Sequence, residues 1–251
     1  MTESDTFYDD LAPFYHLIYP DWEKSIARQG GQLDAVIREL CSDARIILDV
    51  SCGIGTQVLG LTQAGYKVTG SDLSTREIER ARIEASNRDL KISYSVADMR
   101  EAFDHHDAQY DVVISCDNSV PHLLSDNDIL TALKQMYRCI RPGGGCIITV
   151  RDYEKEDLSK QQIKPYGIRE ERGVRWLAWQ IWDPHPPTYD VTMYIVEDRG
   201  DSNCETHVMR SVYYAVEIPR LIELMDGAGF HEVRRLDKSF FQPMIVGTRN
   251  A

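Results

Sequence analysis

The chain has 251 residues, with 28 Lys or Arg against 40 Asp or Glu, so its formal net charge is −12 at pH 7. This length fits one α/β domain with an elaboration, or at most two small domains. The acidic balance argues against a nucleic-acid partner, because Lys and Arg provide most of the affinity for phosphate backbones. No run approaches the roughly 18 apolar residues of a membrane span, and the acidic first ten residues do not resemble a secretory signal. We therefore expect a cytoplasmic protein with no membrane partner.

The cysteines and histidines do not form a recognisable metal motif. The six cysteines, at positions 41, 52, 116, 139, 146 and 204, contain no C-x-x-C pair. Scattered cysteines in a chain of this length are typical of reduced thiols in a cytosolic protein. His105 and His106 stand in a polar stretch and are interpreted as solvated loop residues. The sequence therefore predicts no metal site.

Short apolar runs alternate with helical patterns from about Arg45 to Arg151, and a separate helix precedes them. A helix is predicted over Trp22–Leu40, where Ile26, Leu33 and Ile37 share one face. Five runs are predicted to be strands: Arg45–Val50, Tyr66–Gly70, Lys91–Val96, Tyr110–Ser115 and Cys146–Val150. Helices are predicted between them, from Thr56 to Gly65, from Ser74, and from Ser125 to Ile140. Repeated strand–helix units of this kind predict a parallel, doubly wound sheet.

Particular residues are expected to set the helix ends. Gly65 stands where a left-handed C-cap is wanted. Ser74 and Glu77 have the spacing of a capping box, in which each side chain satisfies a backbone donor. Pro142 and the glycines after it predict a turn that ends the preceding helix.

The pattern changes to a period of two beyond residue 151. Three antiparallel strands are predicted over Val174–Trp182, Tyr189–Glu197 and Val208–Val216. A helix over Pro219–Ala228 and strands over Glu232–Leu236 and Met244–Thr248 are predicted to complete the main sheet. We therefore divide the chain into a helical cap (1–44), a core (45–151), an inserted three-stranded lid (152–216) and the C-terminal part of the core sheet (217–251).

The segment Asp49–Gly55 is the first to carry chemistry. Glycines after a first strand let the backbone approach a ligand, and the following helix offers unpaired N–H groups. A dinucleotide site would want a third glycine where this chain has Val58, which weakens a nicotinamide interpretation without excluding it.

Acidic residues after the second and third strands predict contacts to an adenosine group. Asp72, 17 residues after Gly55, can accept both hydroxyls of a ribose, and its alternative role is to cap the next helix. Asp98 can accept from an adenine amino group while Met99 packs on the ring, although a plain loop explains the pair as well. Together these features predict an adenosine-containing ligand.

These motifs resemble the class I S-adenosylmethionine-dependent methyltransferases over about Arg45 to Val150. The D-x-G-x-G-x-G pattern of that family is matched by Asp49, Ser51, Gly53 and Gly55, with serine in place of the first glycine. The resemblance implies a Rossmann-like sheet in the order 3-2-1-4-5-7-6 with the seventh strand antiparallel. It also implies S-adenosylmethionine as cofactor and S-adenosylhomocysteine as product. The cofactor contacts that it implies beyond the glycine turn are Asp72, Leu73, Asp98, Met99 and Cys116.

Two segments at the ends of strands four and five are expected to meet in one crevice, because ligands of open α/β sheets bind beyond the carboxyl ends of the strands. Arg151 can hold a carboxylate by paired hydrogen bonds, and an ion pair with a nearby acid is the alternative. His122 is interpreted mainly as a packing residue.

These segments are similar to the glycine and sarcosine N-methyltransferases. The Asn-Ser-x-x-His-Leu stretch of that group is matched from Asn118 to Leu123, and its Arg-Asn-Tyr is matched by Arg151–Tyr153 with Asp in the middle. The resemblance implies that Asn118 and Arg151 bind the carboxylate of an amino acid. It also implies that Tyr8, Tyr19 and Arg28 close over the cofactor.

The predicted activity is direct methyl transfer to a small-molecule amine such as glycine or sarcosine, in which alignment of the reactants supplies much of the catalysis. The residues assigned to catalysis are Asn118, Arg151, Tyr153 and Tyr19, and Tyr15 is a further candidate to line the pocket. The alternatives are another metabolite acceptor with an oxygen, carbon or nitrogen nucleophile, an NAD-dependent oxidoreductase, and a non-catalytic sensor of an adenosyl ligand. The choice between a monomer and a homo-oligomer stays open.

Overall fold

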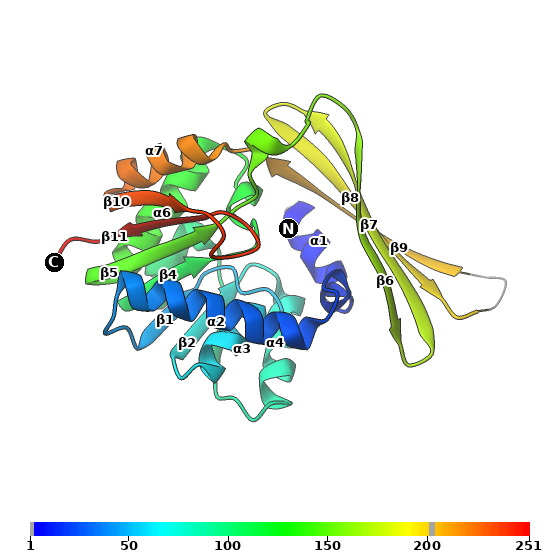
Figure 1. The fold of residues 1–251 in the computed structure, drawn as a ribbon, viewed down its shortest axis with the longest axis horizontal. Helices are drawn as coiled ribbons and strands as arrows, with labels where there is room; N and C mark the ends of the chain where they lie inside the picture. Colours follow the sequence, from blue (N-terminus) through cyan, green and yellow to red (C-terminus); the bar gives the residue numbers. More distant parts are fainter. Residues whose placement is uncertain (1–2, 201–203) are drawn as a thin grey trace.

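The computed structural model describes residues 3–200 and 204–251 and contains two β-sheets with the N-terminal helix between them (Figure 1). The main sheet has the order β10-β11-β5-β4-β1-β2-β3. Its strands are β1 (Ile46–Asp49), β2 (Lys67–Asp72), β3 (Ser93–Val96), β4 (Tyr110–Ser115), β5 (Ile140–Thr149), β10 (His231–Leu236) and β11 (Met244–Thr248). Strands β1 to β5 pair in parallel and β11 is antiparallel to both of its neighbours. The predicted order, including the antiparallel seventh strand, is confirmed.

Helices cover both faces of the main sheet. The helices of the described chain are α1 (Glu3–Leu11), which lies apart from these faces, and α2 (Trp22–Leu40), α3 (Thr56–Gln63), α4 (Thr75–Ser86), α5 (Ala102–His106), α6 (Asp126–Cys139) and α7 (Ile218–Ala228). Short 3₁₀ turns occur at η1 (Tyr15–Ile18), η2 (Met99–Glu101), η3 (Val120–His122) and η4 (Tyr153–Lys155). On β1, Ile47 packs with the α2–α4 side and Leu48 packs with the α6–α7 side. Burial on both faces explains why the central strands are continuous apolar runs.

Two helix starts show how the predicted caps are built. The helix predicted to begin at Ser125 does so, and Ser125 Oγ accepts a hydrogen bond from the Asp128 N–H at the start of α6. At α4, Ser74 Oγ accepts from the Glu77 N–H at 3.1 Å, which confirms half of the predicted capping box. The other half is wrong, because the Ser74 N–H donates to Asp72 Oδ1 and the Glu77 side chain turns elsewhere.

The fifth strand begins earlier than predicted. α6 ends at Cys139 and β5 starts at Ile140, so the predicted Pro142 turn lies within the bounds of the strand. Gly143 has φ of +77° there, and the pairing with β4 shifts register between Tyr110 and Val112. The glycine turn is therefore an irregularity inside β5.

The second sheet, which we call the lid sheet, is antiparallel and has four strands. They are β6 (Gln162–Glu171), β7 (Val174–His185), β8 (Thr188–Asp198) and β9 (Cys204–Tyr214), in that order. The prediction of three strands missed β6. That strand contains Pro165 and Gly167, two residues that are depleted in strands, and its pairing with β7 shifts register between them.

Helix α1 lies between the two sheets, where the sequence suggested only a cap (Figure 1). Its apolar residues Phe7 and Leu11 are buried against Met193, Ile195 and Met209 of the lid sheet. The helix therefore joins the lid sheet to the rest of the molecule.

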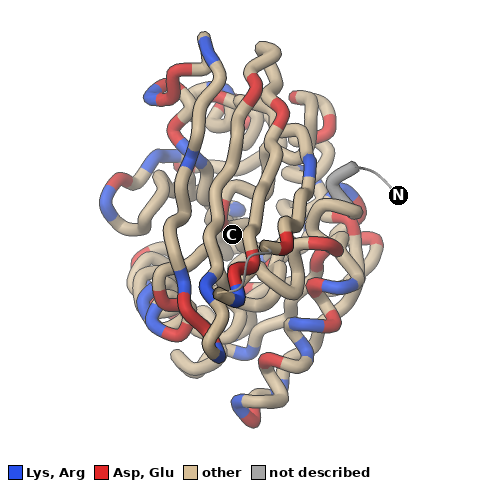
Figure 2. Tube along the Cα trace, turned by 90° about the vertical axis from the view of Figure 1, so that its right-hand side faces the viewer, with Lys and Arg blue, Asp and Glu red and all other residues tan. Residues whose placement is uncertain are grey.

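The surface carries both signs of charge. Looking onto the lid sheet, Figure 2 shows Lys and Arg interspersed with Asp and Glu, and the middle parts of the lid strands are mostly uncharged. Within the described residues, no helix has the length and apolar character needed to cross a membrane.

Candidate functional site

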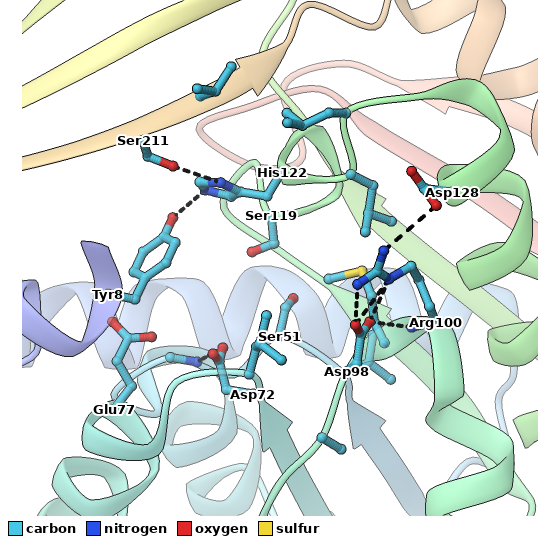
Figure 3. Close-up of a pocket in the computed structure, with 18 of the residues that line it drawn as sticks. Tyr8, Ser51, Asp72, Glu77, Asp98, Arg100, Ser119, His122, Asp128 and Ser211 are labelled. Carbon is cyan, nitrogen blue, oxygen red and sulfur yellow. Dashed lines mark hydrogen bonds and ion pairs between the residues drawn. The ribbon is translucent and has the colours of Figure 1, made fainter. Parts of the chain in front are cut away.

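Two cavities lie beyond the carboxyl ends of the parallel strands. The larger cavity has a volume of about 330 Å³ and the smaller cavity has a volume of about 40 Å³. The larger cavity is lined by side chains of the glycine turn, the ends of β2 and β3, the η3 region and β9 (Figure 3). The smaller cavity lies between α1, the ends of β4 and β5, and the lid sheet. Tyr8 and Tyr15 line both cavities, so the two spaces meet at these rings.

The glycine turn presents backbone to the larger cavity. Gly53 has φ of +52°, and a Cβ added there would lie 3.3 Å from Glu77 Oε2. Gly55, the N-cap of α3, has φ of +97°. Both conformations favour glycine. Ser51 lines the cavity and its Oγ lies 2.8 Å from Ser115 Oγ.

Asp49 supports this turn from behind. Its side chain is fully buried and Oδ1 accepts the Ser51 N–H at 3.1 Å. Burial raises the pKa of Asp49 to about 8. Asp49 is not among the lining residues of either cavity. Its position fits a role in holding the turn.

Asp72 lies in the wall of the larger cavity at the end of β2. Its carboxylate accepts the Gly53 N–H at 2.9 Å and the Ser74 N–H at 3.0 Å, which ties the glycine turn to the start of α4. Burial raises the pKa of Asp72, and the backbone hydrogen bonds oppose that rise. Leu73, which is 39% exposed, lines the cavity next to it.

Asp98 and Met99 line the larger cavity on the β3 side. The Asp98 carboxylate forms paired hydrogen bonds with the Arg100 guanidinium and accepts the Arg100 N–H at 2.8 Å. Burial alone would raise the pKa of Asp98, but the bonds from Arg100 outweigh it and the pKa is lowered. Arg100 also lies 3.7 Å from Asp128. Sequence reasoning did not include Arg100 in the site.

Glu77 is a second residue that sequence reasoning missed, because its place in a capping motif explained it. The side chain is 1% exposed and lines the larger cavity, with Tyr8 and Asp72 beside it (Figure 3). Its Oε1 atom has no hydrogen-bond partner in the described structure. Burial, followed by the charges of Asp72 and Asp9, raises the pKa of Glu77 well above its usual value. Glu77 is thus a buried carboxyl group aimed into the cavity.

A hydrogen-bonded group connects α1 to η3 and the lid sheet. The Tyr8 hydroxyl lies 2.7 Å from His122 Nε2 and 3.3 Å from the Tyr213 hydroxyl. Ser211 Oγ lies 3.4 Å from His122 Nδ1. Burial lowers the pKa of His122 to about 3, so the ring is neutral at pH 7. His122 lines the larger cavity and is more than the packing residue that the sequence suggested.

Arg151 lines the smaller cavity from the end of β5. Its guanidinium carbon lies 4.3 Å from the centre of the Trp182 ring, and Nη1 lies 3.5 Å from the Tyr189 hydroxyl. Among the described residues, no carboxylate lies within 4.0 Å of this guanidinium. The alternative interpretation of Arg151, a direct ion pair with a local acid, is therefore not what the described structure contains.

Asn118 and Tyr153 hold Arg151 in place. Asn118 Oδ1 accepts the Arg151 backbone N–H at 2.9 Å, and Asn118 Nδ2 donates to the Tyr153 hydroxyl at 2.9 Å. Asn118 lines the smaller cavity, whereas Tyr153 lies behind it and contacts Tyr189 at 3.0 Å. Tyr153, which the sequence assigned to catalysis, lines neither cavity and contacts Asn118 instead.

Asp117 also lines the smaller cavity and was not singled out from the sequence. Its Oδ2 atom accepts a 3.0 Å hydrogen bond from Tyr19. Tyr19 does not line either cavity and therefore reaches the site through Asp117.

Two of the predicted cofactor residues, Arg28 and Cys116, line neither cavity. Arg28 lies on the exposed side of α2 and lines neither cavity, because the neighbouring residues Ile26 and Gln29 take the buried face of the helix. Its prediction as a cofactor contact is corrected. Cys116 is 2% exposed and lies behind the cavity walls.

The chain is similar to known methyltransferases. Residues 47–144 match the family described as methyltransferase domain. The chain is 32% identical to the putative methyltransferase YqeM of Bacillus subtilis (strain 168) over 237 residues, which cover 93% of this chain and 87% of that protein. It is 30% identical to the glycine/sarcosine N-methyltransferase of Parasynechococcus marenigrum (strain WH8102) over 135 residues, which cover 54% of this chain and 47% of that enzyme.

The fold is also similar to solved structures. The structure of CalS10 with bound S-adenosylmethionine, an amino pentose methyltransferase from Micromonospora echinaspora, has a TM-score of 0.76 and 18% identity. The match covers 90% of this chain and 92% of that chain. At this level of identity the likeness concerns the fold.

Proposed function

Because the chain belongs to the S-adenosylmethionine-dependent methyltransferases, we propose that it methylates the nitrogen of a small amine that bears a carboxylate, such as glycine or sarcosine. The acceptors named for similar proteins differ, since one is glycine or sarcosine and another is an amino pentose. The choice among acceptors therefore depends on the residues of the smaller cavity.

The residues of the larger cavity fit the cofactor. The exposed backbone at Gly53 leaves space that a Cβ would fill, and the buried Glu77 carboxyl has an oxygen without a partner. Asp72 offers acceptors for ribose hydroxyls and Met99 offers an apolar surface for a ring. S-adenosylmethionine supplies a methyl group on a positively charged sulfur, which a neutral amine can attack.

The observation that carries the acceptor proposal is the state of Arg151. A guanidinium keeps its charge in proteins, and burying a charge without a partner is costly. The Trp182 ring supports this cation from one side, and no described carboxylate lies within 4.0 Å of it. An acceptor carboxylate would complete the paired hydrogen bonds that the planar guanidinium is shaped to make.

The size of the smaller cavity favours a small acceptor. A volume of about 40 Å³ accommodates only a few non-hydrogen atoms and leaves little room for a sugar or a quinone ring. Four tyrosines line it, Tyr8, Tyr15, Tyr166 and Tyr213. A small acceptor held there faces the larger cavity at Tyr8 and Tyr15, and alignment of this kind contributes about 7–11 kcal/mol in favourable cases.

The test is a transfer assay with the isotope-labelled methyl group of S-adenosylmethionine. The panel contains glycine, sarcosine, dimethylglycine, an amino pentose and a catechol. We expect label on an amino acid, and an Arg151→Gln variant with an acceptor KM raised about a hundredfold at an unchanged Kd for S-adenosylhomocysteine. Label on the amino pentose or the catechol alone would refute the proposed acceptor. Unchanged acceptor KM in the variant would refute the role of Arg151.

A further inference from the structure

Asp117 lies two residues after the end of β4 and has an unfavourable backbone conformation. Its φ is +58°, a left-handed value that costs energy for any residue other than glycine, although Asp and Asn tolerate it best. The Asp117 N–H donates to Thr149 Oγ1 at 2.8 Å, and Gln242 Nε2 lies 3.5 Å from Asp117 Oδ1. These contacts hold the carboxylate in the wall of the smaller cavity.

Asp117 and Arg151 occupy different sides of that cavity. Asp117 contacts Tyr19 and interacts electrostatically with Tyr15 and Glu77, which belong to the side of the larger cavity. Arg151 lies against Trp182 and Tyr189 of the lid sheet. The two charges attract each other, but they do not form an ion pair within 4.0 Å in the described structure. The smaller cavity is therefore negative toward the larger cavity and positive toward the lid sheet.

A free amino acid has the complementary arrangement of charges. Its carboxylate and ammonium group are separated by one carbon, and an opposite charge at each end would fix its direction. Resting on the proposed function, we propose that Asp117 is the catalytic residue that binds the acceptor's ammonium group and takes its proton. The nitrogen then faces the larger cavity while the acceptor carboxylate lies on Arg151.

The proton transfer prepares the nucleophile. An ammonium nitrogen has no free electron pair. When one N–H bond breaks, the proton passes to a carboxylate oxygen of Asp117 and the electron pair stays on nitrogen. That pair forms the new N–C bond, while the electrons of the broken S–C bond remain on sulfur. Asp117 returns its proton to water when the product leaves.

The surroundings of Asp117 suit a proton acceptor. Burial raises the pKa of Asp117, while the hydrogen bond from Tyr19 and the charge of Arg151 oppose the rise. A raised pKa brings the carboxylate closer to the pH at which it must gain and release protons. The titratable groups that interact with it, besides the acceptor, are Tyr8, Tyr15, Tyr19, Tyr166, Glu77, Cys116 and Arg151.

The first experiment measures binding to the full chain saturated with S-adenosylhomocysteine. Calorimetry compares glycine, which has both charges, with acetate, which has only the carboxylate. Asp117→Asn keeps the shape of the side chain, and Asn tolerates the left-handed backbone. We expect this variant to bind glycine about tenfold to a hundredfold more weakly and acetate within twofold of the parent. The matched Arg151→Gln variant is expected to weaken both ligands.

The second experiment measures the pH dependence of kcat/KM for glycine. The parent is expected to lose activity toward low pH as Asp117 gains a proton, and this limb should vanish in Asp117→Asn. Tyr19→Phe removes a hydrogen bond to the carboxylate without removing the carboxylate itself. It should move the limb upward by about one pH unit, because the lost hydrogen bond is one that lowers the pKa of Asp117.

The outcomes separate the two proposals. If Asp117→Asn weakens the binding of glycine and acetate equally, or weakens neither, the role of Asp117 is overturned while the effects of Arg151→Gln stand. An unmoved pH limb in Tyr19→Phe would overturn it as well. If the parent binds neither glycine nor acetate, the proposed acceptor class and this inference are refuted together.

Discussion

The Arg151 guanidinium carbon lies 4.3 Å from the centre of the Trp182 ring, and the Arg151 side chain also lines the smaller cavity. A planar cation that lies over an aromatic face has a restricted orientation, and under the proposed function its paired N–H groups bind the acceptor carboxylate. Lysine has the same charge, but its ammonium group is not planar and cannot donate two parallel hydrogen bonds to one carboxylate.

Arg151→Lys is therefore expected to raise the KM for the acceptor about tenfold, with little change in the Kd for S-adenosylhomocysteine. Steady-state kinetics and calorimetry check this. Arg235→Lys is the matched control, because Arg235 pairs with Asp152 and lines neither cavity. A similar KM increase in the control would point to a general loss of structure.

Asp72→Asn is expected to weaken cofactor binding about tenfold to a hundredfold. The amide that replaces a carboxylate oxygen cannot accept both the Gly53 N–H and ribose hydroxyls as the charged group does. Calorimetry with S-adenosylhomocysteine measures the change. Asp34→Asn, on α2 away from both cavities, should leave binding within twofold.

Glu77→Gln is expected to weaken S-adenosylmethionine more than S-adenosylhomocysteine. The parent carboxyl is buried in the cavity wall without a partner for Oε1, and S-adenosylmethionine carries one more positive charge than its product. A positively charged ligand favours loss of the proton that the raised pKa of Glu77 retains in the ligand-free protein, and Gln cannot gain a negative charge in this way, so the substitution costs the charged ligand more. Competition calorimetry gives both Kd values, and an equal change in the two would contradict the prediction.

The stability of the ligand-free protein should fall as pH rises. Asp49 has a pKa near 3.8 when unfolded and about 8 when folded, so the folded state holds its proton more tightly. Its stabilising contribution is complete below pH 4 and is lost as pH rises to about 8, on the order of a few kcal/mol. Melting curves at pH 5 and pH 8 should therefore show a smaller drop in Tm for Asp49→Asn than for the parent. An equal drop would rule out Asp49 as a cause.

Two adjacent glycines in α2 should respond in opposite directions to alanine. A Cβ at Gly30 would lie 2.6 Å from the backbone carbon of Gly60 in α3, whereas a Cβ at Gly31 meets nothing within 4 Å. Gly30→Ala should lower the free energy of unfolding by about 1–3 kcal/mol. Gly31→Ala should raise it by about 0.5–1 kcal/mol, because alanine favours the helix. Chemical denaturation measures both, and equal signs would contradict the prediction.

The main sheet was predictable because its signals are local. The apolar run before Asp49, the glycines at 53 and 55, and the caps at Ser74 and Ser125 each act within a few residues. The strand order came from the family resemblance. Local patterns place individual strands, and pairing between distant strands is a tertiary property.

The missed features depend on contacts between distant parts of the chain. Helix α1 is short and largely polar, and it is supported by the packing of Phe7 and Leu11 on the lid sheet. Asp117 and Arg151 are 34 residues apart and come together only through the parallel pairing of β4 and β5. The misplacement of Arg28 has the reverse cause, since the family match there ignored which face of α2 is buried.

The left-handed backbone at Asp117 sets thermal stability against catalytic activity at one position. Glycine adopts a φ of +58° without the penalty that a side chain pays, so Asp117→Gly should make the protein more resistant to heat. The same change removes the carboxylate that we propose to bind the acceptor's ammonium group. A library of variants selected only for survival at high temperature should therefore accumulate glycine at this position and lose turnover as it does so.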